Sequence, residues 1–479
     1  MGKSQGNKVT GGLIWTFGER ITAQLVSTVV GIILARVLSP EHYGVISIVT
    51  VFITFFNVFV TSGFCSAIVQ KKEVDQSDYD TAFAIGLCIS IIAYLILFFT
   101  APVISDFYEM PILTNVIRVM SIRLPLAALN SIQQAYVRRK MEFKKFFIST
   151  SFGTVISGIV GILLAVKGAG VWALVIQYLT NTTIDSIVMW FVSGWRPKGK
   201  ISLIKAKGIF SFGWKILASD LVATLEADIK SLVIGKSFGS SELAFYDQGK
   251  KYPALIVNNI NSSINKVMLP AYSRSQDNFI ALKSMLRKSI RIGLFILAPI
   301  MIGMAAVSNN FVTVILTEKW RACVPFIQIF CICYLSRPIE TSCQQSILAI
   351  GRSDVTLKIM ILVNSISICT MLIAAFIFKS VLLIAIGSLI TCLVSLSSYL
   401  TITNKLLDYS LYEQIRDFIP AIISSLVMGC VVKIVGIISL TPFFVLIIQV
   451  ITGIVSYSIL SFVFQKEAIG TIFNILKRK

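Results

Sequence analysis

The sequence predicts an all-α polytopic membrane protein, and three observations carry that prediction. Hydrophobic residues make up 56% of the 479 residues and charged residues only 14%, whereas soluble domains carry about 25% charged residues. The mean hydropathy is +0.83. About fourteen apolar segments approach or exceed the roughly 20 residues that an α-helix needs to cross a bilayer. Their approximate centres lie near residues 25, 55, 92, 122, 157, 182, 222, 260, 300, 335, 367, 390, 428 and 452.

The distribution of charge predicts how these segments are oriented. The net charge is +20, and a nucleic-acid-binding protein would concentrate such charge on a soluble face. Here most cations lie in alternate short loops, near residues 138–145, 196–207 and 274–291, and in the tail after 466. The positive-inside rule therefore places these loops and both termini in the cytoplasm. We expect no nucleic-acid partner.

The nine cysteines lie in or beside apolar segments. Cys331 and Cys333 are separated by one residue, which is not a zinc-ligand spacing. Buried thiols commonly act as small apolar side chains. We expect no disulfide framework, no metal and no cofactor.

Two halves of the chain resemble each other. Gln133-Gln134 and Gln344-Gln345, which are 211 residues apart, each precede a polar or basic loop and a new segment. Six helices followed by six in parallel is a repeat type of secondary transporters. We therefore expect a six-helix lobe over 1–200, a second over 201–410, and two additional transmembrane helices with a basic tail over 411–479.

The first segment carries polar residues on one face. Arg20, Gln24, Ser27 and Gly31 fall within a wedge of about 60° at helical spacing. Arginine suits the bidentate capture of phosphate, so Arg20 and Gln24 are candidate substrate-binding residues. The alternative is that Arg20 pairs with Glu19 near the membrane surface.

The seventh segment, near residue 222, carries charges of both signs. Lys215 and Lys230 are candidate substrate-binding residues on one face, although Glu226 and Lys230 also form a favourable i,i+4 pair. Asp220 and Asp228 lie elsewhere on the helix. A carboxylate inside a membrane is a candidate for coupling to a proton or a sodium ion, so Asp228, then Asp220 and Glu226, are candidate ion-coupling residues.

The eighth segment, near residue 260, has an amide-rich face. Amides and hydroxyls both donate and accept hydrogen bonds, as sugar hydroxyls require, although helix–helix hydrogen bonds could also use them. The candidate substrate-binding residues here are Lys251, Asn258, Asn261, Ser262 and Asn265.

The fourth and tenth segments add Arg118, Arg123, Arg337 and Glu340. Arg123 joins the candidate substrate-binding residues. The last four segments are almost free of internal charge. Function is thus expected in the segments near residues 25, 122, 222, 260 and 335.

No feature of the sequence favours an enzyme. A membrane-bound polysaccharide polymerase or glycosyltransferase would be expected to have a large extracytoplasmic loop or a soluble catalytic domain, and neither is evident. No Asp-x-Asp pair or histidine cluster stands at a segment end. A passive channel would not need two matched lobes. We assign no catalytic residue.

Several runs resemble the signatures of polysaccharide flippases in the multidrug/oligosaccharidyl-lipid/polysaccharide exporter superfamily. They are ILARVLSPEHYG at 33–44, SGFCSAIVQKK at 62–72, GVWALV at 170–175, DIKSLVIGK at 228–236, and NINSSI followed by LPA within 259–271. The resemblance covers about residues 10–400 and is closest to the branch that exports lipopolysaccharide, capsule or teichuronic acid. The family usually has an acidic residue where His42 stands and glycine where Ala244 stands.

The resemblance implies fourteen transmembrane helices, with the two six-helix lobes around a central cavity. It implies a monomer in the bacterial cytoplasmic membrane that flips an undecaprenyl-diphosphate-linked oligosaccharide by alternating access, for surface polysaccharide assembly. The diphosphate would bind cations, the glycan would occupy the polar volume, and the lipid tail would stay in the bilayer. H⁺ or Na⁺ and the polysaccharide polymerase machinery are the further partners it suggests. A drug exporter of the same superfamily is the alternative, and it should favour carboxylates because its substrates are cationic.

Overall fold

The computed structural model describes residues 18, 22–71, 73–465 and 470, with side chains placed at all of these except 62–64, 66, 212, 262–267 and 270. Within that part of the chain, the structure is helical and contains no strand. The all-α prediction is confirmed. The chain divides into two compact units, Met1–Ala244 and Phe245–Lys479, and the predicted lobe boundary near residue 200 stays a prediction.

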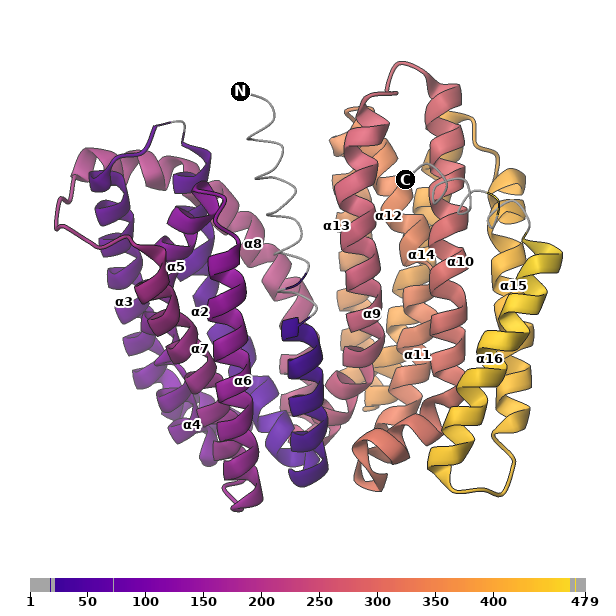
Figure 1. The fold of residues 1–479 in the computed structure, drawn as a ribbon, viewed down its shortest axis with the longest axis horizontal. Helices are drawn as coiled ribbons and strands as arrows, with labels where there is room; N and C mark the ends of the chain where they lie inside the picture. Colours follow the sequence, from indigo (N-terminus) through magenta and orange to yellow (C-terminus); the bar gives the residue numbers. More distant parts are fainter. Residues whose placement is uncertain (1–17, 19–21, 72, 466–469, 471–479) are drawn as a thin grey trace. The chain divides into compact units, whose positions relative to one another are not determined.

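Unit 1 is a bundle of long helices, coloured indigo to magenta in Figure 1. The helix α2 packs against α8 and α5, and α7 packs against α6 and α5. The helices of this unit are Thr22–Val37, α2 (Pro40–Gln70), α3 (Gln76–Tyr108), α4 (Ile112–Met120), α5 (Arg123–Arg139), α6 (Lys144–Val166), α7 (Val171–Ser193), α8 (Leu203–Phe238) and the first turn of α9 (Ser240–Ser273).

Unit 2 is a second helical bundle, in which α10 contacts α11, α12, α15 and α16. The pair α15 and α16 pack on each other at the C-terminal end of the chain, in yellow (Figure 1). After α9, its elements are α10 (Phe279–Phe311), a π turn (Val312–Leu316), a 3₁₀ turn (Glu318–Cys323), α11 (Val324–Leu335), α12 (Arg337–Ala349), α13 (Ser353–Leu372), a π turn (Ile373–Ile377), α14 (Val381–Leu407), α15 (Leu411–Val435) and α16 (Pro442–Phe464).

Most of these helices are long and apolar enough to cross a membrane. Among the described residues, ten spans meet that test, and α8 makes eleven if its segments Leu203–Ser211 and Gly213–Phe238 form one span. The remaining helices are Thr22–Val37, which is shorter, and α7 and α9, which are more polar. Together they give the fourteen predicted helices, so the count from the sequence is supported.

Apolar side chains cover the outside of the helices, as lipid requires. On α16, Phe462, Val463 and Phe464 are about three-fifths exposed, at 63%, 59% and 61%. The polar backbone is satisfied within each helix, which is the arrangement that hydrocarbon permits. The chain is therefore a multi-pass membrane protein.

The basic segment between α7 and α8 is fixed to the start of α3. The Asp80 carboxylate accepts hydrogen bonds from the backbone N–H groups of Lys198, at 3.1 Å, and Lys200, at 3.0 Å. Lys205 pairs with Asp75 at 2.5 Å, and this hydrogen-bonded ammonium lowers the pKa of Asp75 to about 2. Because the pKa of Asp75 is lowered, its ion pair with Lys205 is intact at pH values above the usual carboxylate pKa. The pair is lost only as the pH falls through about 2. The segment is thus held to unit 1 at physiological pH.

Candidate functional site

Gln24, one of the predicted residues of unit 1, has a defined hydrogen-bond partner. The Gln24 amide donates to the Thr28 hydroxyl at 3.3 Å, and that hydroxyl donates to the Gln24 carbonyl oxygen at 2.7 Å. Gln24 is half-buried and bonded within its own helix. Arg20, which shares its predicted face, lies outside the described residues.

Arg123 is fixed by two side chains of α7. Its Nε donates to the Thr182 hydroxyl at 3.1 Å, and the guanidinium carbon lies 5.1 Å from the centre of the Tyr178 ring. The side chain is half-buried, and its terminal nitrogens make no hydrogen bond to other described residues. A guanidinium held on one edge with its other donors available is suited to binding an anion.

The predicted residues of α8 differ in exposure. Lys215 and Glu226 are exposed, whereas Asp220, Asp228 and Lys230 are half-buried. Asp228 and Lys230 each interact with a neighbouring group. These five residues stay candidates, since no contact assigns any of them to substrate or ion binding.

The predicted polar face of α9 is partly described. Lys251 and Asn258 are exposed and Asn261 is half-buried. The Asn261 side-chain oxygen is buried and has no hydrogen-bond partner among the described residues. The side chains of Ser262 and Asn265 lie outside the described residues. A buried acceptor without a partner is consistent with a face that binds hydroxyl donors.

Sequence reasoning missed a carboxylate on α7. Asp185 is half-buried and accepts a hydrogen bond from the Asn130 amide of α5 at 2.6 Å. Farther along the same two helices, the Ser193 hydroxyl donates to the side-chain amide oxygen of the buried Gln133 at 2.7 Å. The signal was the polar run from Gln177 to Asp185, which lowers the hydropathy of this helix. The sixth segment therefore belongs with those that carry functional candidates.

The polar residues predicted in the tenth segment form a compact group in unit 2. Arg337 and Glu340 pair at 3.6 Å. Glu340 is 6% exposed and also accepts hydrogen bonds from the hydroxyls of Ser336 and Ser395, the latter at 3.0 Å. These contacts compensate the buried carboxylate.

The expectation that the last four segments are almost free of internal charge was wrong at one position. The Asp417 side chain on α15 is fully buried and accepts hydrogen bonds from Arg287, Arg291 and Tyr409. The two arginines had been counted only as loop cations that set orientation. They lie instead on α10, beside a basic cavity of about 750 Å³ that Lys283, Lys288 and Lys405 also line.

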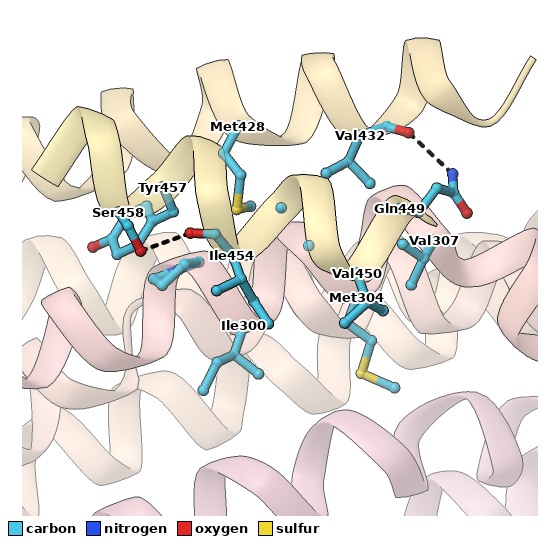
Figure 2. Close-up of a pocket in the computed structure, with 13 residues that line it drawn as sticks. Ile300, Met304, Val307, Met428, Val432, Gln449, Val450, Ile454, Tyr457 and Ser458 are labelled. Atoms are coloured by element: carbon cyan, nitrogen blue, oxygen red, sulfur yellow. Dashed lines mark hydrogen bonds between the residues drawn. The ribbon is translucent and has the colours of Figure 1, made fainter. Parts of the chain in front are cut away.

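An apolar cavity of about 400 Å³ lies between α10, α15 and α16 (Figure 2). Ile300, Val307 and Met428 are among the aliphatic side chains that line it. The Gln449 amide at its edge is engaged, because it donates to the Val432 carbonyl oxygen at 3.0 Å, a bond drawn in Figure 2. Such a lining accepts a hydrocarbon chain and offers little to a glycan.

The described residues contain no group of three or more His, Cys, Asp or Glu side chains that could hold a metal ion. Arg123, the amides of α9 and the apolar cavity supply three kinds of binding group. Cations can bind an anion, amides can bind hydroxyls, and the apolar cavity can bind hydrocarbon.

Known proteins with similar sequences are named for the biosynthesis of lipopolysaccharide and of teichuronic acid. The lipopolysaccharide biosynthesis protein WzxC of Escherichia coli (strain K12) is 23% identical over 333 residues, which are 68% of this chain and 67% of the relative. The teichuronic acid biosynthesis protein TuaB of Bacillus subtilis (strain 168) is 26% identical over 304 residues, 63% of this chain and 62% of the relative. The matches thus span about two thirds of these relatives.

Solved structures share the fold. The lipid II flippase MurJ, in an inward closed conformation, superposes with a TM-score of 0.80 at 14% identity, covering 95% of this chain and all of that one. An inward-facing multidrug resistance MATE family transporter of the MOP superfamily gives a TM-score of 0.60 at 14% identity, covering 81% of this chain and 96% of that one. The transporter-like fold predicted from the sequence is confirmed.

The family itself is shown by a match along the chain. Residues 33–325 fit the model of a family described as polysaccharide biosynthesis protein. That stretch is more than half of the chain, and it contains the runs at 33–44, 62–72 and 228–236 on which the resemblance rested. The chain belongs to the polysaccharide biosynthesis protein family.

Proposed function

We propose that the protein flips an undecaprenyl-diphosphate-linked oligosaccharide across the bacterial cytoplasmic membrane by alternating access, for surface polysaccharide assembly. The observation that carries the proposal is the family match over residues 33–325. The Arg123 guanidinium and the amides of α9 support it, because they can bind a diphosphate and a glycan. A drug exporter of the same fold would need carboxylates to attract cationic substrates. No covalent step is required, so the proposed activity is transport and not catalysis.

The proposal divides the substrate among the candidate residues by chemistry. The diphosphate is assigned to the cations Arg20, Arg123, Lys215, Lys230 and Lys251, with Gln24 beside Arg20. Arg123 supports this assignment, because only its Nε is bonded, to the Thr182 hydroxyl, among the described residues. Its two terminal nitrogens can therefore donate to an anion. The glycan is assigned to the amides and hydroxyl of α9, which are Asn258, Asn261, Ser262 and Asn265.

The lipid tail needs an apolar path. We assign it to the bilayer and to the apolar surface of unit 2, where the cavity between α10, α15 and α16 offers aliphatic contacts. Burial of each methylene group contributes about 0.8 kcal/mol. The tail can therefore remain in a hydrocarbon environment while the headgroup crosses.

The membrane potential, which is negative inside, favours outward movement of the negatively charged substrate. Each elementary charge that crosses is worth about 2.3 kcal/mol per 100 mV, so a diphosphate with two charges gains around 4 to 5 kcal/mol. The empty carrier returns without the negative charge of the substrate, so its own net charge decides how the potential acts on that step. A carboxylate that takes up H⁺ or Na⁺ would set the charge of that state, and Asp228, Asp220 and Glu226 on α8 are candidates.

Both termini and the loop at residues 138–145 are proposed to be cytoplasmic, and the loop around Lys167 to lie outside. Single cysteines placed in each loop of a cysteine-free variant should separate the two sides when intact cells meet an impermeant thiol reagent. We expect labelling near Lys167 and protection at 138–145. Labelling of 138–145 from outside would refute the topology.

The cellular test of the function uses a strain that lacks this gene. We expect loss of surface polysaccharide and accumulation of its lipid-linked repeat unit in the inner leaflet. The protein would act as a monomer that delivers substrate to the polymerase machinery. Normal surface polysaccharide together with new sensitivity to cationic drugs would instead support the exporter alternative.

A further inference from the structure

Each unit contains a hydrogen-bonded pair of polar side chains with the same separation in the sequence. In unit 1, Asn130 of α5 bonds to Asp185 of α7, and in unit 2, Glu340 of α12 bonds to Ser395 of α14. Both pairs are separated by 55 residues in the sequence. In each unit the first helix of the pair follows a break within a membrane-length span, Ile112–Arg139 in one and Glu318–Ala349 in the other. The pairs therefore occupy equivalent places in the repeat, with the carboxylate on opposite members.

The two carboxylates have different surroundings. Glu340 is compensated by the Arg337 guanidinium at 3.6 Å and by the hydroxyls of Ser336 and Ser395. Asp185 has no ion pair among the described residues. Its Oδ2 accepts from the Asn130 amide at 2.6 Å. Its Oδ1 is buried near the Ser149 hydroxyl and has no hydrogen bond of normal geometry to another described residue. Glu340 thus has a guanidinium partner, whereas Asp185 has none among the described residues.

Asn130 also has an unused group. Asn130 is 4% exposed, and its side-chain oxygen Oδ1 is buried and accepts no hydrogen bond from another described residue. Two unpartnered oxygens on adjacent side chains are unusual, because buried polar atoms are normally hydrogen-bonded. One added hydrogen would serve both oxygens, since a proton on Asp185 Oδ1 could be donated to the Asn130 side-chain oxygen while Oδ2 keeps accepting from the Asn130 N–H.

The charged and polar side chains on the helices around Asp185 contact other groups. Arg123 is held by Thr182 and Tyr178, and Ser149 of α6, which lies beside the carboxyl, donates to the Phe146 carbonyl oxygen at 3.4 Å. The other charged groups on or beside the helices packed against α7 lie at helix ends or contact other groups. They are Arg118, bonded to the Phe98 carbonyl; Lys145, bonded to the Ser193 carbonyl and paired with Glu142; Arg138, over the Phe146 ring; Arg139, bonded to the Lys71 carbonyl; His42, bonded to Ser39; and Glu41 and Lys144 at helix starts. The titratable Tyr43 and Cys65 donate to the Gly31 and Ser131 carbonyls, and the Tyr136 ring packs on Tyr79.

We propose that Asp185 and Asn130 form the proton-binding site of this protein, and that Glu340 is its fixed, ion-paired counterpart. A proton from water on one side adds to Oδ1 of the Asp185 carboxylate and gives the neutral acid, whose O–H donates to the Asn130 side-chain oxygen. Release of the proton to water on the other side restores the carboxylate, which still accepts from the Asn130 N–H.

As a coupling site, this assignment rests on the proposed flippase function, so its test uses two independent readouts. The first is infrared titration of the purified protein, which follows the carboxyl stretch as the pH changes and needs no substrate. Asp185→Asn should remove a titrating carboxyl band, and the matched change Glu340→Gln should leave it. An unchanged set of titrating bands in Asp185→Asn overturns the proposal, whatever the substrate is.

The second readout is flux of lipid-linked oligosaccharide in proteoliposomes, with a pH gradient, a sodium gradient and the membrane potential clamped separately. Asp185→Asn should abolish the response to the pH gradient and keep the response to the potential, and Asp185→Glu should restore part of the former. Loss of the pH response in Asp228→Asn but not in Asp185→Asn, or a response to sodium alone, overturns the assignment. If no variant moves the substrate, the flippase proposal fails, while the infrared titration still decides the proton site.

Discussion

Replacing Asp417 with alanine is expected to destabilise unit 2 more than any other single change to a charged residue, by about 3–5 kcal/mol. The Asp417 side chain is fully buried and accepts from Arg287 Nε at 2.6 Å and from the Tyr409 hydroxyl at 2.6 Å. It also accepts from Arg291 Nε at 3.1 Å. The alanine variant removes the acceptor shared by two guanidinium groups, and the remaining contact of Arg287 with Glu413, at 3.7 Å, is longer and more exposed. Unfolding in mixed detergent micelles would measure the loss.

A matched control is available in the same unit. Arg352 and Asp354 pair at 2.9 Å, but their side chains are 48% and 50% exposed. An exposed pair contributes at most about 1 kcal/mol, so Asp354→Ala should change the free energy of unfolding little. Equal effects of Asp354→Ala and Asp417→Ala would contradict the structural role given to Asp417.

Arg20→Ala should abolish surface polysaccharide while leaving the protein inserted in the membrane. Arginine offers a planar donor fork that matches a phosphate, so Arg20→Lys should rescue only partly. Lys215→Ala is expected to have a similar effect, and Lys251→Ala a smaller one. Surface polysaccharide and membrane-inserted protein would be measured in the same cells.

Arg36→Ala provides the control for this series, because Arg36 is exposed at the far end of the same apolar segment. It removes the same charge without touching the proposed diphosphate site, so output should be near that of the wild type. Full polysaccharide output from Arg20→Ala would remove Arg20 from the anion site.

The fold could be predicted from the sequence because hydrocarbon imposes simple rules. A bilayer requires apolar runs of a set length and allows only helices or closed barrels to cross it, so segments such as Pro442–Phe464 are evident from composition alone. The helices α7 and α9 are less apolar, yet each was located, because polar side chains interrupt their apolar pattern without ending it.

The candidate site was less predictable, because it depends on which helices are neighbours. The pairing of Asp185 with Asn130 joins residues 55 positions apart, and no local spacing indicates it. Arg287 and Arg291 were interpreted as orientation signals, since the carboxylate that binds them lies on α15. Asp417 was overlooked because a single acidic residue near the start of an apolar segment resembles an interfacial charge.

The most direct test of the account is a flipping measurement with purified protein. Proteoliposomes would carry an undecaprenyl-diphosphate-linked oligosaccharide with a labelled glycan, and an impermeant glycosidase or quencher outside would report which leaflet holds it. The account predicts that the protected fraction becomes accessible only when the protein is present, and faster when the potential favours outward movement of negative charge. Equal accessibility with and without the protein, while the same vesicles expel a cationic drug, would contradict it.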